Sequence, residues 1–331
     1  MAGVHFLRAT GGWGTVISGF RRLSRSWRNF WFSPQETSSL ALFRIAFGLI
    51  TALWTLTLGP NLFAFLGASG ILPDPPPGYP GEWGVLTGSS GSAVLVAVWA
   101  TTFFGAVALT VGWRTRLAAS VVFVGVVSLQ HRNWLILNSG DGLIRNLAFY
   151  CALAPSGTAL SLDRWRIAPD RFWEFPVRAP WALRLIQIQL SVVYLSAVWH
   201  KVQGELWRNG TAVSYALRVT DVHRFPVPAF LTQSVELTEL LTFGTLALEL
   251  ALAVLVWNRA ARPWVLTMGA SMHIMIDYSI LVGFFSLAML ATYLTFISPE
   301  TASRFILAGR DRCRWPRLPC STGPAPPGGE T

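Results

Sequence analysis

Charged residues are scarce in this sequence. Only 13% of its 331 residues are Asp, Glu, Lys or Arg, whereas soluble domains carry about 25%. A soluble chain of this length would need a charged shell around its core, so the composition excludes an ordinary soluble domain. The apolar residues make up 52% of the chain and occur in long uncharged blocks. Such blocks are typical of membrane-spanning helices, so we expect an integral membrane protein.

Cysteine and lysine are scarce as well. The three cysteines, Cys151, Cys313 and Cys320, form no disulfide framework, and no histidine near the last two completes a zinc site. Lys201 is the only lysine among 26 basic residues. The other 25 are arginines, a bias typical of a GC-rich genome, so a bacterial origin is expected.

The net charge of +10 has two explanations. A basic chain can bind nucleic acid, but no basic patch stands apart from the apolar blocks. The basic residues fall between these blocks, where they set the orientation of spans in the membrane. The expected partner is therefore the lipid bilayer, and no nucleic-acid partner is predicted.

The apolar blocks predict an all-α fold, a polytopic helix bundle of about eight spans. A helix needs about 20 residues to cross a bilayer, and two blocks are short, so seven or nine spans are the alternatives. The eight blocks lie at about 38–58, 91–112, 117–137, 142–160, 180–203, 236–257, 263–283 and 284–299.

Arginines concentrate in the first segment, in alternate connections such as 161–179, and in the last segment. The positive-inside rule then places both termini in the cytoplasm of a bacterial cell. The loops at 59–90, 131–141 and 202–235 face outward. Loop 59–90, which is rich in proline and glycine, is expected to be ordered.

Three regions are predicted. In residues 1–36, aromatic residues recur at helical spacing with arginines between them, which is typical of an amphipathic helix at the membrane interface. A cleaved signal peptide is the weaker alternative, because no small-residue cleavage site follows an apolar core. Residues 37–300 form the transmembrane domain. Residues 301–331 form a cytoplasmic tail that is expected to be disordered.

The block at 180–203 carries a polar stripe that ends in Lys201. Its members follow each other at spacings of 3, 4, 3, 4 and 3, which places them on one helix face. Polar side chains are unfavourable in contact with lipid, so this face is expected to line the bundle interior or a water-filled cavity. Lys201, next to His200, either acts as a base or extends to the outer headgroups. The stripe comprises Arg184, Gln187, Ser191, Tyr194, Val198 and Lys201.

Glu249 is the deepest acid and needs a partner, because a charge inside a membrane is expensive. Arg44, Arg184 and His273 are the candidate partners. A structural ion pair and a catalytic acid both remain open. Arg44 lies near the cytoplasmic end of the first block, so it can alternatively extend to the headgroups.

His273 and Asp277 are four residues apart, so they can touch on one helix face. They are interpreted either as an oriented imidazole for proton transfer or as interhelical hydrogen bonding. Two ligands alone do not make a metal site, and no metal is predicted.

Polar residues also mark the loop at 131–141. Asn138 and Asp141 flank a turn, and Arg145 follows one helical turn later, where it can pair with Asp141. Arg132 and Asn133 precede that turn.

Four of these motifs, in this order, resemble the HTTM (horizontally transferred transmembrane) domain over residues 38–298. The motifs are Leu40–Gly48 around Arg44, the run from Arg132-Asn133 to Asn138–Asp141, Tyr194–Lys201 followed by Trp207, and Glu249 to His273 to Phe285-Ser286.

The HTTM domain is similar to the membrane part of vitamin K-dependent gamma-glutamyl carboxylase. In that enzyme, the lysine that matches Lys201 deprotonates vitamin K hydroquinone. Oxygenation then yields a strong base, which removes a proton from a glutamate side chain before carbon dioxide is added. The resemblance implies that Lys201 is a base, that a reduced quinone is the cofactor, and that a peptide or protein is the substrate.

The expected site residues form two sets. The catalytic set comprises Lys201, His200, His273, Asp277 and Glu249. The substrate or cofactor pocket comprises Gln187, Ser191, Tyr194, Arg132, Asn133, Asn138, Asp141 and Trp207.

One departure from the family pattern keeps a second class of function open. The carboxylase has a histidine directly after the asparagine that matches Asn138, where this chain has Ser139. The alternative is a non-catalytic membrane partner, in peptide-toxin maturation, export or immunity, or a permease.

Overall fold

The computed structural model describes residues 11–73, 83–86 and 91–312. The expectations for residues 1–10, for most of the proline-rich part of loop 59–90 and for residues 313–331, with Cys313 and Cys320, lie outside these ranges.

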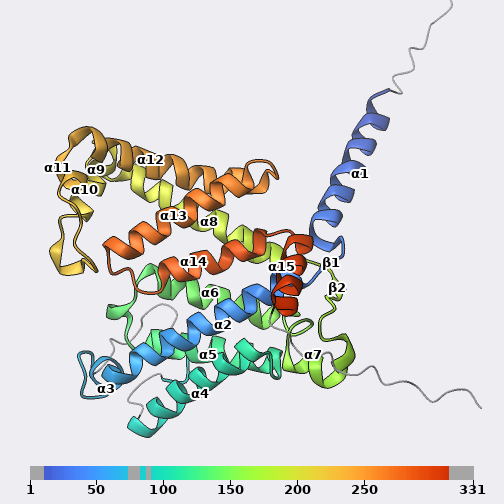
Figure 1. Cartoon of the computed structure of the whole chain (residues 1–331), viewed down its shortest axis with the longest axis horizontal. Helices are drawn as coiled ribbons and strands as arrows, with labels where there is room; N and C mark the ends of the chain where they lie inside the picture. Colours follow the sequence, from blue (N-terminus) through green and yellow to red (C-terminus); the bar gives the residue numbers. More distant parts are fainter. Residues whose placement is uncertain (1–10, 74–82, 87–90, 313–331) are drawn as a thin grey trace, which may run out of the picture.

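Each of the eight predicted apolar blocks contains a helix of the bundle (Figure 1). These helices are α2 (Ser38–Leu58), α4 (Ser92–Val111), α5 (Thr115–Arg132), α6 (Ser139–Leu153), α8 (Trp181–Gln203), α12 (Val235–Val254), α13 (Arg262–Ser279) and α14 (Phe285–Tyr293). Short helices connect them: α3 (Leu62–Leu66), α7 (Leu162–Ile167), α9 (Glu205–Arg208), α10 (Ala212–Ala216) and α11 (Phe230–Gln233). The helices α1 (Gly11–Phe32) and α15 (Pro299–Arg312) flank the bundle.

The protein is an all-α membrane protein. Four helical segments of the described chain are long and apolar enough to cross a bilayer: Ser38–Leu66, Ser92–Val111, Trp181–Gln203 and Val235–Trp257. A shorter apolar helix covers Phe285–Phe296. The count of eight spans stays a prediction, as does the interfacial position of α1.

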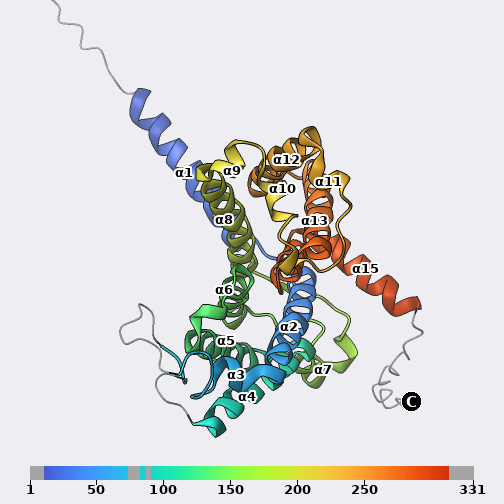
Figure 2. The ribbon, with the colours of Figure 1, turned by 90° about the vertical axis from the view of Figure 1, so that its left-hand side faces the viewer.

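The long helices form two groups, seen end-on in Figure 2. The first contains α2, α4 and α5, and the second contains α8, α12 and α13. Helices α6 and α14 join them, because α6 packs against both α5 and α8 while α14 packs against α2, α6 and α13. This junction between the groups positions the candidate site.

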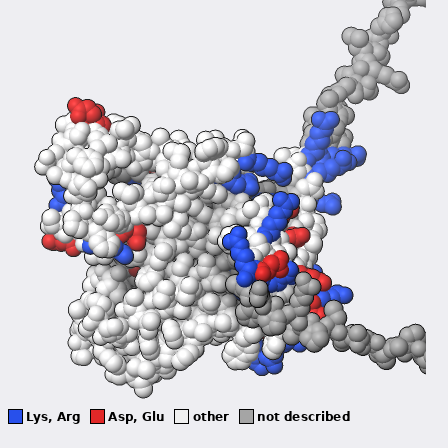
Figure 3. All heavy atoms as spheres, viewed as in Figure 1, with Lys and Arg blue, Asp and Glu red and all other residues white. Residues whose placement is uncertain are grey.

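The connections gather at two opposite ends of the bundle. Helices α3 and α9–α11 lie at one end, and α1, α7 and α15 lie at the other (Figure 1). Charged residues concentrate at these ends, and the middle of the face in Figure 3 is almost free of them. The predicted outer loops thus share one end, while the assignment of the other end to the cytoplasm stays a prediction.

A two-residue antiparallel pairing joins β1 (Gln35–Glu36) to β2 (Val177–Arg178). Next to it, the backbone N–H and the hydroxyl of Thr37 both donate to the carbonyl of Pro176, at 3.2 and 3.0 Å. The segments before α2 and α8 are therefore tied together. The sequence analysis predicted no strand here, because two residues are too few for a periodic pattern.

The expectation of a disordered tail from residue 301 is wrong for residues 301–312, which belong to α15. Pro299 and Glu300 suit a helix start, and Arg310 and Arg312 suit its end. The start of α15 is held on α2, since the Ser38 hydroxyl donates to the Pro299 carbonyl at 2.9 Å.

Arg44 is fully buried, so the prediction that it extends to the headgroups is wrong. Its guanidinium donates to three backbone carbonyls in the turn after α6, those of Ser156 (3.2 Å), Ala159 (3.4 Å) and Leu160 (2.5 Å). A forked cation suits this role, because one side chain supplies several donors to a turn that has no helical partners for its carbonyls. Arg44 thereby fixes α2 against the end of α6.

Replacing Arg44 with methionine should destabilise the protein by about 3 kcal/mol, because three buried carbonyls lose their donors. Thermal unfolding in detergent, followed by size-exclusion chromatography, measures the effect. Arg116→Met is the control, since Arg116 is exposed on α5. Equal stability of the two variants would contradict the assigned role of Arg44.

Candidate active site

The polar stripe of α8 faces the bundle interior, as predicted. Gln187, Ser191 and Tyr194 are buried. The Gln187 amide donates to the carbonyl of Thr295 at 2.6 Å, and the Ser191 hydroxyl donates to that of Ala253 at 2.9 Å. These bonds fix the rotation of α8, so they also fix where the outer part of the stripe points.

Lys201 forms an ion pair with Glu249 of α12, its Nζ donating to Oε1. The Lys201 side chain is 25% exposed and that of Glu249 is 7% exposed. The Lys201 amine also lies 4.7 Å from the ring centroid of Trp207, in a cation–π contact. The partner of Glu249 is therefore Lys201, and the predicted candidates Arg44, Arg184 and His273 do not form this pair.

The second oxygen of Glu249 has a different environment. Oε2 is buried and has no hydrogen-bond partner. Unpaired polar atoms are rare inside proteins and require an explanation. Because Glu249 lines a cavity, we interpret this oxygen as a contact point for a bound molecule or a proton.

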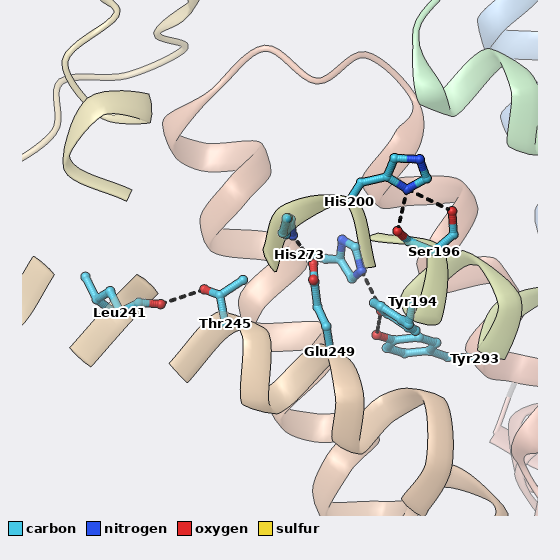
Figure 4. Close-up of polar contacts among 9 residues, drawn as sticks. Tyr194, Ser196, His200, Leu241, Thr245, Glu249, His273 and Tyr293 are labelled. Carbon is cyan, nitrogen blue, oxygen red and sulfur yellow. Dashed lines mark hydrogen bonds and ion pairs between the residues drawn. The ribbon is translucent and has the colours of Figure 1, made fainter. Parts of the chain in front are cut away.

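His273 is held by two tyrosines. Its Nε2 is 2.8 Å from the Tyr194 hydroxyl, which in turn hydrogen-bonds the Tyr293 hydroxyl (Figure 4). The other ring nitrogen, Nδ1, is buried without a partner. Phe285 packs edge-on against the imidazole, with ring centroids 5.7 Å apart. One ring nitrogen of His273 is therefore fixed by Tyr194, and the other is buried without a hydrogen-bond partner among the described residues.

A cavity of about 500 Å³ opens beside these groups at the junction of the two helix groups. It is lined by α6, α8, α12, α13 and α14. Most of the exposed area of its wall is apolar, although nine of its lining residues are polar or ionisable. The polar or ionisable residues are Ser139, Asn146, Gln189, Tyr194, Ser196, His200, Lys201, Glu249 and His273.

Five predicted site residues line this cavity: Tyr194, His200, Lys201, Glu249 and His273. Trp207 covers Lys201 from the loop side. His200 is turned away from the imidazole of His273 (Figure 4), and its Nδ1 bonds back to the Ser196 carbonyl at 2.8 Å. The chemical roles of these residues stay predictions.

Asp277 does not contact His273, so the predicted pairing is wrong. Asp277 forms an ion pair with Arg224 at 3.2 Å, near the outer loops. The spacing of four residues allowed the contact, but His273 turns toward Tyr194 on α8 instead. Asp277 is therefore not part of the candidate site.

The loop residues are also outside the cavity. Arg132 donates to the carbonyls of Gly67, Leu72 and Pro73, and Asn133 donates to that of Phe65 at 2.7 Å. Asn133 anchors α3, and Arg132 anchors the segment after it, to the end of α5. Their role in the structure is to shape the end of the bundle at which α3 lies.

Asn138 and Asp141 cap the start of α6. The Asn138 side chain accepts from the backbone N–H of Asp141 at 3.3 Å, and the Asp141 carboxylate accepts from that of Asn138 at 2.8 Å. Asp141 also accepts from the Trp54 indole at 2.7 Å, whereas Arg145 contacts His131 at 3.3 Å. The predicted pair of Asp141 and Arg145 is wrong, and this motif places the cavity-lining face of α6.

Gln187 and Ser191 do not line the Lys201 cavity either. The Ser191 hydroxyl accepts from the Trp257 indole at 2.9 Å, so serine and tryptophan occupy the interior between the two ends of the stripe. Gln187 instead lines a second cavity at the arginine-rich end.

Tyr293 and Asn146 were not predicted from the sequence, and Phe285 was named only as part of the family resemblance. Asn146 carried a signal, because it is a polar residue inside a predicted span. Tyr293 carried none, since an aromatic residue in an apolar block is an ordinary core residue. The contacts of Tyr293 and Phe285 with His273 depend on how α13 and α14 pack.

One known family matches this chain. The family model of the HTTM domain matches residues 83–300, more than half of the chain. The chain belongs to the HTTM-domain family. The matched region contains α8, α12, α13 and α14, which supply the Lys201–Glu249 pair and His273. This membership relates the membrane protein to the vitamin K-dependent carboxylase. No solved structure matches this fold.

A double-mutant cycle tests the ion pair of this HTTM protein. Lys201→Met should cost about 2 kcal/mol of unfolding free energy, because it leaves a buried carboxylate without its partner. Glu249→Leu should cost less, since the partly exposed ammonium can turn toward water. The double variant should be more stable than the Lys201→Met variant. Additive losses, measured by unfolding in mixed micelles, would exclude the coupling.

Proposed function

We propose that this HTTM protein is a membrane enzyme in which Lys201 acts as a base on a reduced, quinone-like molecule. The observation that carries the proposal is the placement of the only lysine. Lys201 pairs with buried Glu249 and lines a largely apolar cavity. A base that must act on a lipophilic molecule needs this combination of an amine, an acid and an apolar wall.

The residues present fit a quinone-like ring. Ligand pockets measure about 300–1,000 Å³, and the Lys201 cavity is about 500 Å³. Its apolar wall, with Phe285 and Met272, suits the ring faces, and the unpartnered atoms Glu249 Oε2 and His273 Nδ1 suit ring oxygens or hydroxyls. When bound, a reduced quinone supplies an acidic hydroxyl and two electrons for reaction with oxygen.

In this proposal Lys201 and Glu249 together remove the proton from the bound hydroxyl. In an apolar environment both charged groups of an ion pair lose hydration. The free-energy difference between the ion pair and the neutral pair, in which the proton sits on the carboxylate, is therefore smaller than in water. Transfer of the proton from Lys201 Nζ to Glu249 leaves a neutral amine. That amine then takes the proton of a bound hydroxyl. The Glu249 carboxylate is thus the proton acceptor that converts Lys201 to its neutral, basic form.

His273 orients the bound molecule in this proposal. Tyr194 and Tyr293 hold one face of the histidine, and Nδ1 is the remaining donor or acceptor. The substrate is then a peptide or protein that meets the cavity at the end where α9–α11 lie, which is the outer face of a bacterial membrane in the predicted topology.

The main alternative is a non-catalytic partner or a permease. A permease needs a continuous polar route along the bundle, and Glu249 and Arg44 are the residues expected to line it. Arg44 instead binds backbone carbonyls, and the hydrogen bond of Ser191 to Trp257 lies on the α8 face below Tyr194. These contacts leave Arg44 and Ser191 out of a polar route along the bundle, which favours an enzyme over a permease.

Replacement of Lys201 provides the test. Lys201→Ala and Lys201→Arg should each reduce the reaction by at least about 10²-fold, because a positioned base contributes on that scale and arginine stays protonated. The measurement is the mass change of peptides encoded next to this chain, co-expressed with each variant and analysed by mass spectrometry.

The matched control is Arg208→Ala, which removes a nearby exposed cation on α9. It should retain the wild-type mass change at the same expression level. Full modification by both Lys201 variants, with normal membrane levels, would exclude the lysine base. A wild-type protein that causes no mass change in any neighbouring peptide would favour the non-catalytic alternative.

A further inference from the structure

A second cavity, of about 1,030 Å³, lies at the arginine-rich end of the bundle. Helices α8, α13 and α15, the end of α1 and the β1–β2 pairing surround it. Arg184 is 17 residues from Lys201, a rise of about 25 Å along α8. The two cavities therefore lie near opposite ends of the same span. The proposed lysine base does not use this second cavity.

Three arginines line the cavity: Arg184, Arg259 and Arg262. They are close enough for Arg259 and Arg262 to act electrostatically on Arg184. Like charges at this distance repel each other, so the cluster is more favourable when an anion joins it. Among the described residues, none of the three has a carboxylate within 4 Å.

The arginines keep donors free for such an anion. Arg184 uses Nε on the Phe30 carbonyl at 3.3 Å and Nη1 on the Gln187 amide oxygen at 2.8 Å. Arg262 uses Nε on the Val256 carbonyl at 2.9 Å and Nη1 on the Phe296 carbonyl at 3.3 Å. These bonds hold both guanidinium groups in place, while the second η nitrogen of each has no hydrogen-bond partner among the described residues.

Two acids also line the cavity, so it is not uniformly positive. Glu36 accepts a hydrogen bond from the Ser303 hydroxyl at 2.6 Å, and Glu300 lies in the first turn of α15. The cavity therefore carries three cations and two anions. It favours a ligand with a phosphate on the arginine side and polar groups toward the acids, rather than a highly charged polyanion.

Aromatic and aliphatic residues form the remaining wall. Phe30 lies under the Arg184 guanidinium at 4.9 Å, and Trp257 packs on Phe296 with ring centroids 5.5 Å apart. Leu183 and Leu266 complete the apolar part. Such a wall suits a hydrocarbon chain, which free phosphate lacks. The start of α8 also lies near the level at which phospholipid headgroups sit.

We propose that this cavity binds the phosphate-bearing headgroup of a membrane phospholipid, through Arg184, Arg259 and Arg262. The apolar wall contacts the beginning of the lipid chains. Arginine suits the phosphate because its planar fork matches two phosphate oxygens. The lipid thereby joins α1, α8, α13 and α15 at the end of the bundle that the topology assigns to the cytoplasm.

The test compares three probes on the purified full chain in detergent. Dihexanoyl phosphatidylglycerol should raise the melting temperature in a saturable way. Inorganic phosphate and dihexanoylglycerol, at the same concentrations, should not. In Arg259→Gln the apparent affinity for dihexanoyl phosphatidylglycerol should fall about tenfold, the effect expected for one charge-assisted bond. Arg259 is the safest variant, because it is exposed and makes no side-chain hydrogen bond among the described residues.

Arg184→Gln is the second variant and should show a similar loss, while Arg116→Gln, an exposed arginine outside the cavity, should bind as the wild type does. Equal affinity of Arg259→Gln, Arg184→Gln and the wild type would overturn the site. A shift by inorganic phosphate as strong as that by the lipid would overturn the lipid as the ligand. Native mass spectrometry adds an independent readout, since fewer phospholipids should stay bound to both cavity variants.

Discussion

The ion pair of Lys201 and Glu249 is the interaction on which the account of this HTTM protein depends. Two opposite charges at the edge of an apolar cavity are stable only together, and removing either one leaves a charge with no partner. The pair also joins the end of α8 to α12. The packing of α8 on α12 and the proposed reaction therefore depend on the same two side chains. Tyr194 and His273 form their hydrogen bond next to this pair.

Helix α8 organises both halves of the molecule. One face carries polar residues along most of the span. Arg184 and Gln187 lie at the arginine-rich end, Ser191 binds the half-buried Trp257, and Lys201 lines the cavity near its Glu249 partner. The hydrogen bonds of Gln187 and Ser191 fix the rotation of α8. The position of the amine is thus set by contacts along the whole helix rather than by the loop after it.

Long apolar blocks were sufficient to predict where the bundle helices lie, and the spacing of polar residues was sufficient to predict the inward face of α8, because both are local features of the sequence. These features did not predict partners, which depend on how distant helices pack. Glu249 needed a cation, but only the fold brings Lys201 to it. Asp277 was in reach of His273 by spacing, yet Arg224 from a distant loop pairs with it. Tyr293 was indistinguishable from a core residue until α14 packed against α13.

The most direct test of the central claim uses the fact that the chain has one lysine. Reductive methylation with ¹³C-formaldehyde labels Lys201, whose dimethylamine then gives one NMR signal apart from that of the N-terminal amine. The account predicts a signal that differs from that of a free dimethyl-lysine, shifts in Glu249→Gln, and shifts again in the wild type when a reduced short-chain menaquinone is added. A signal at the free position, unchanged by both, would contradict it.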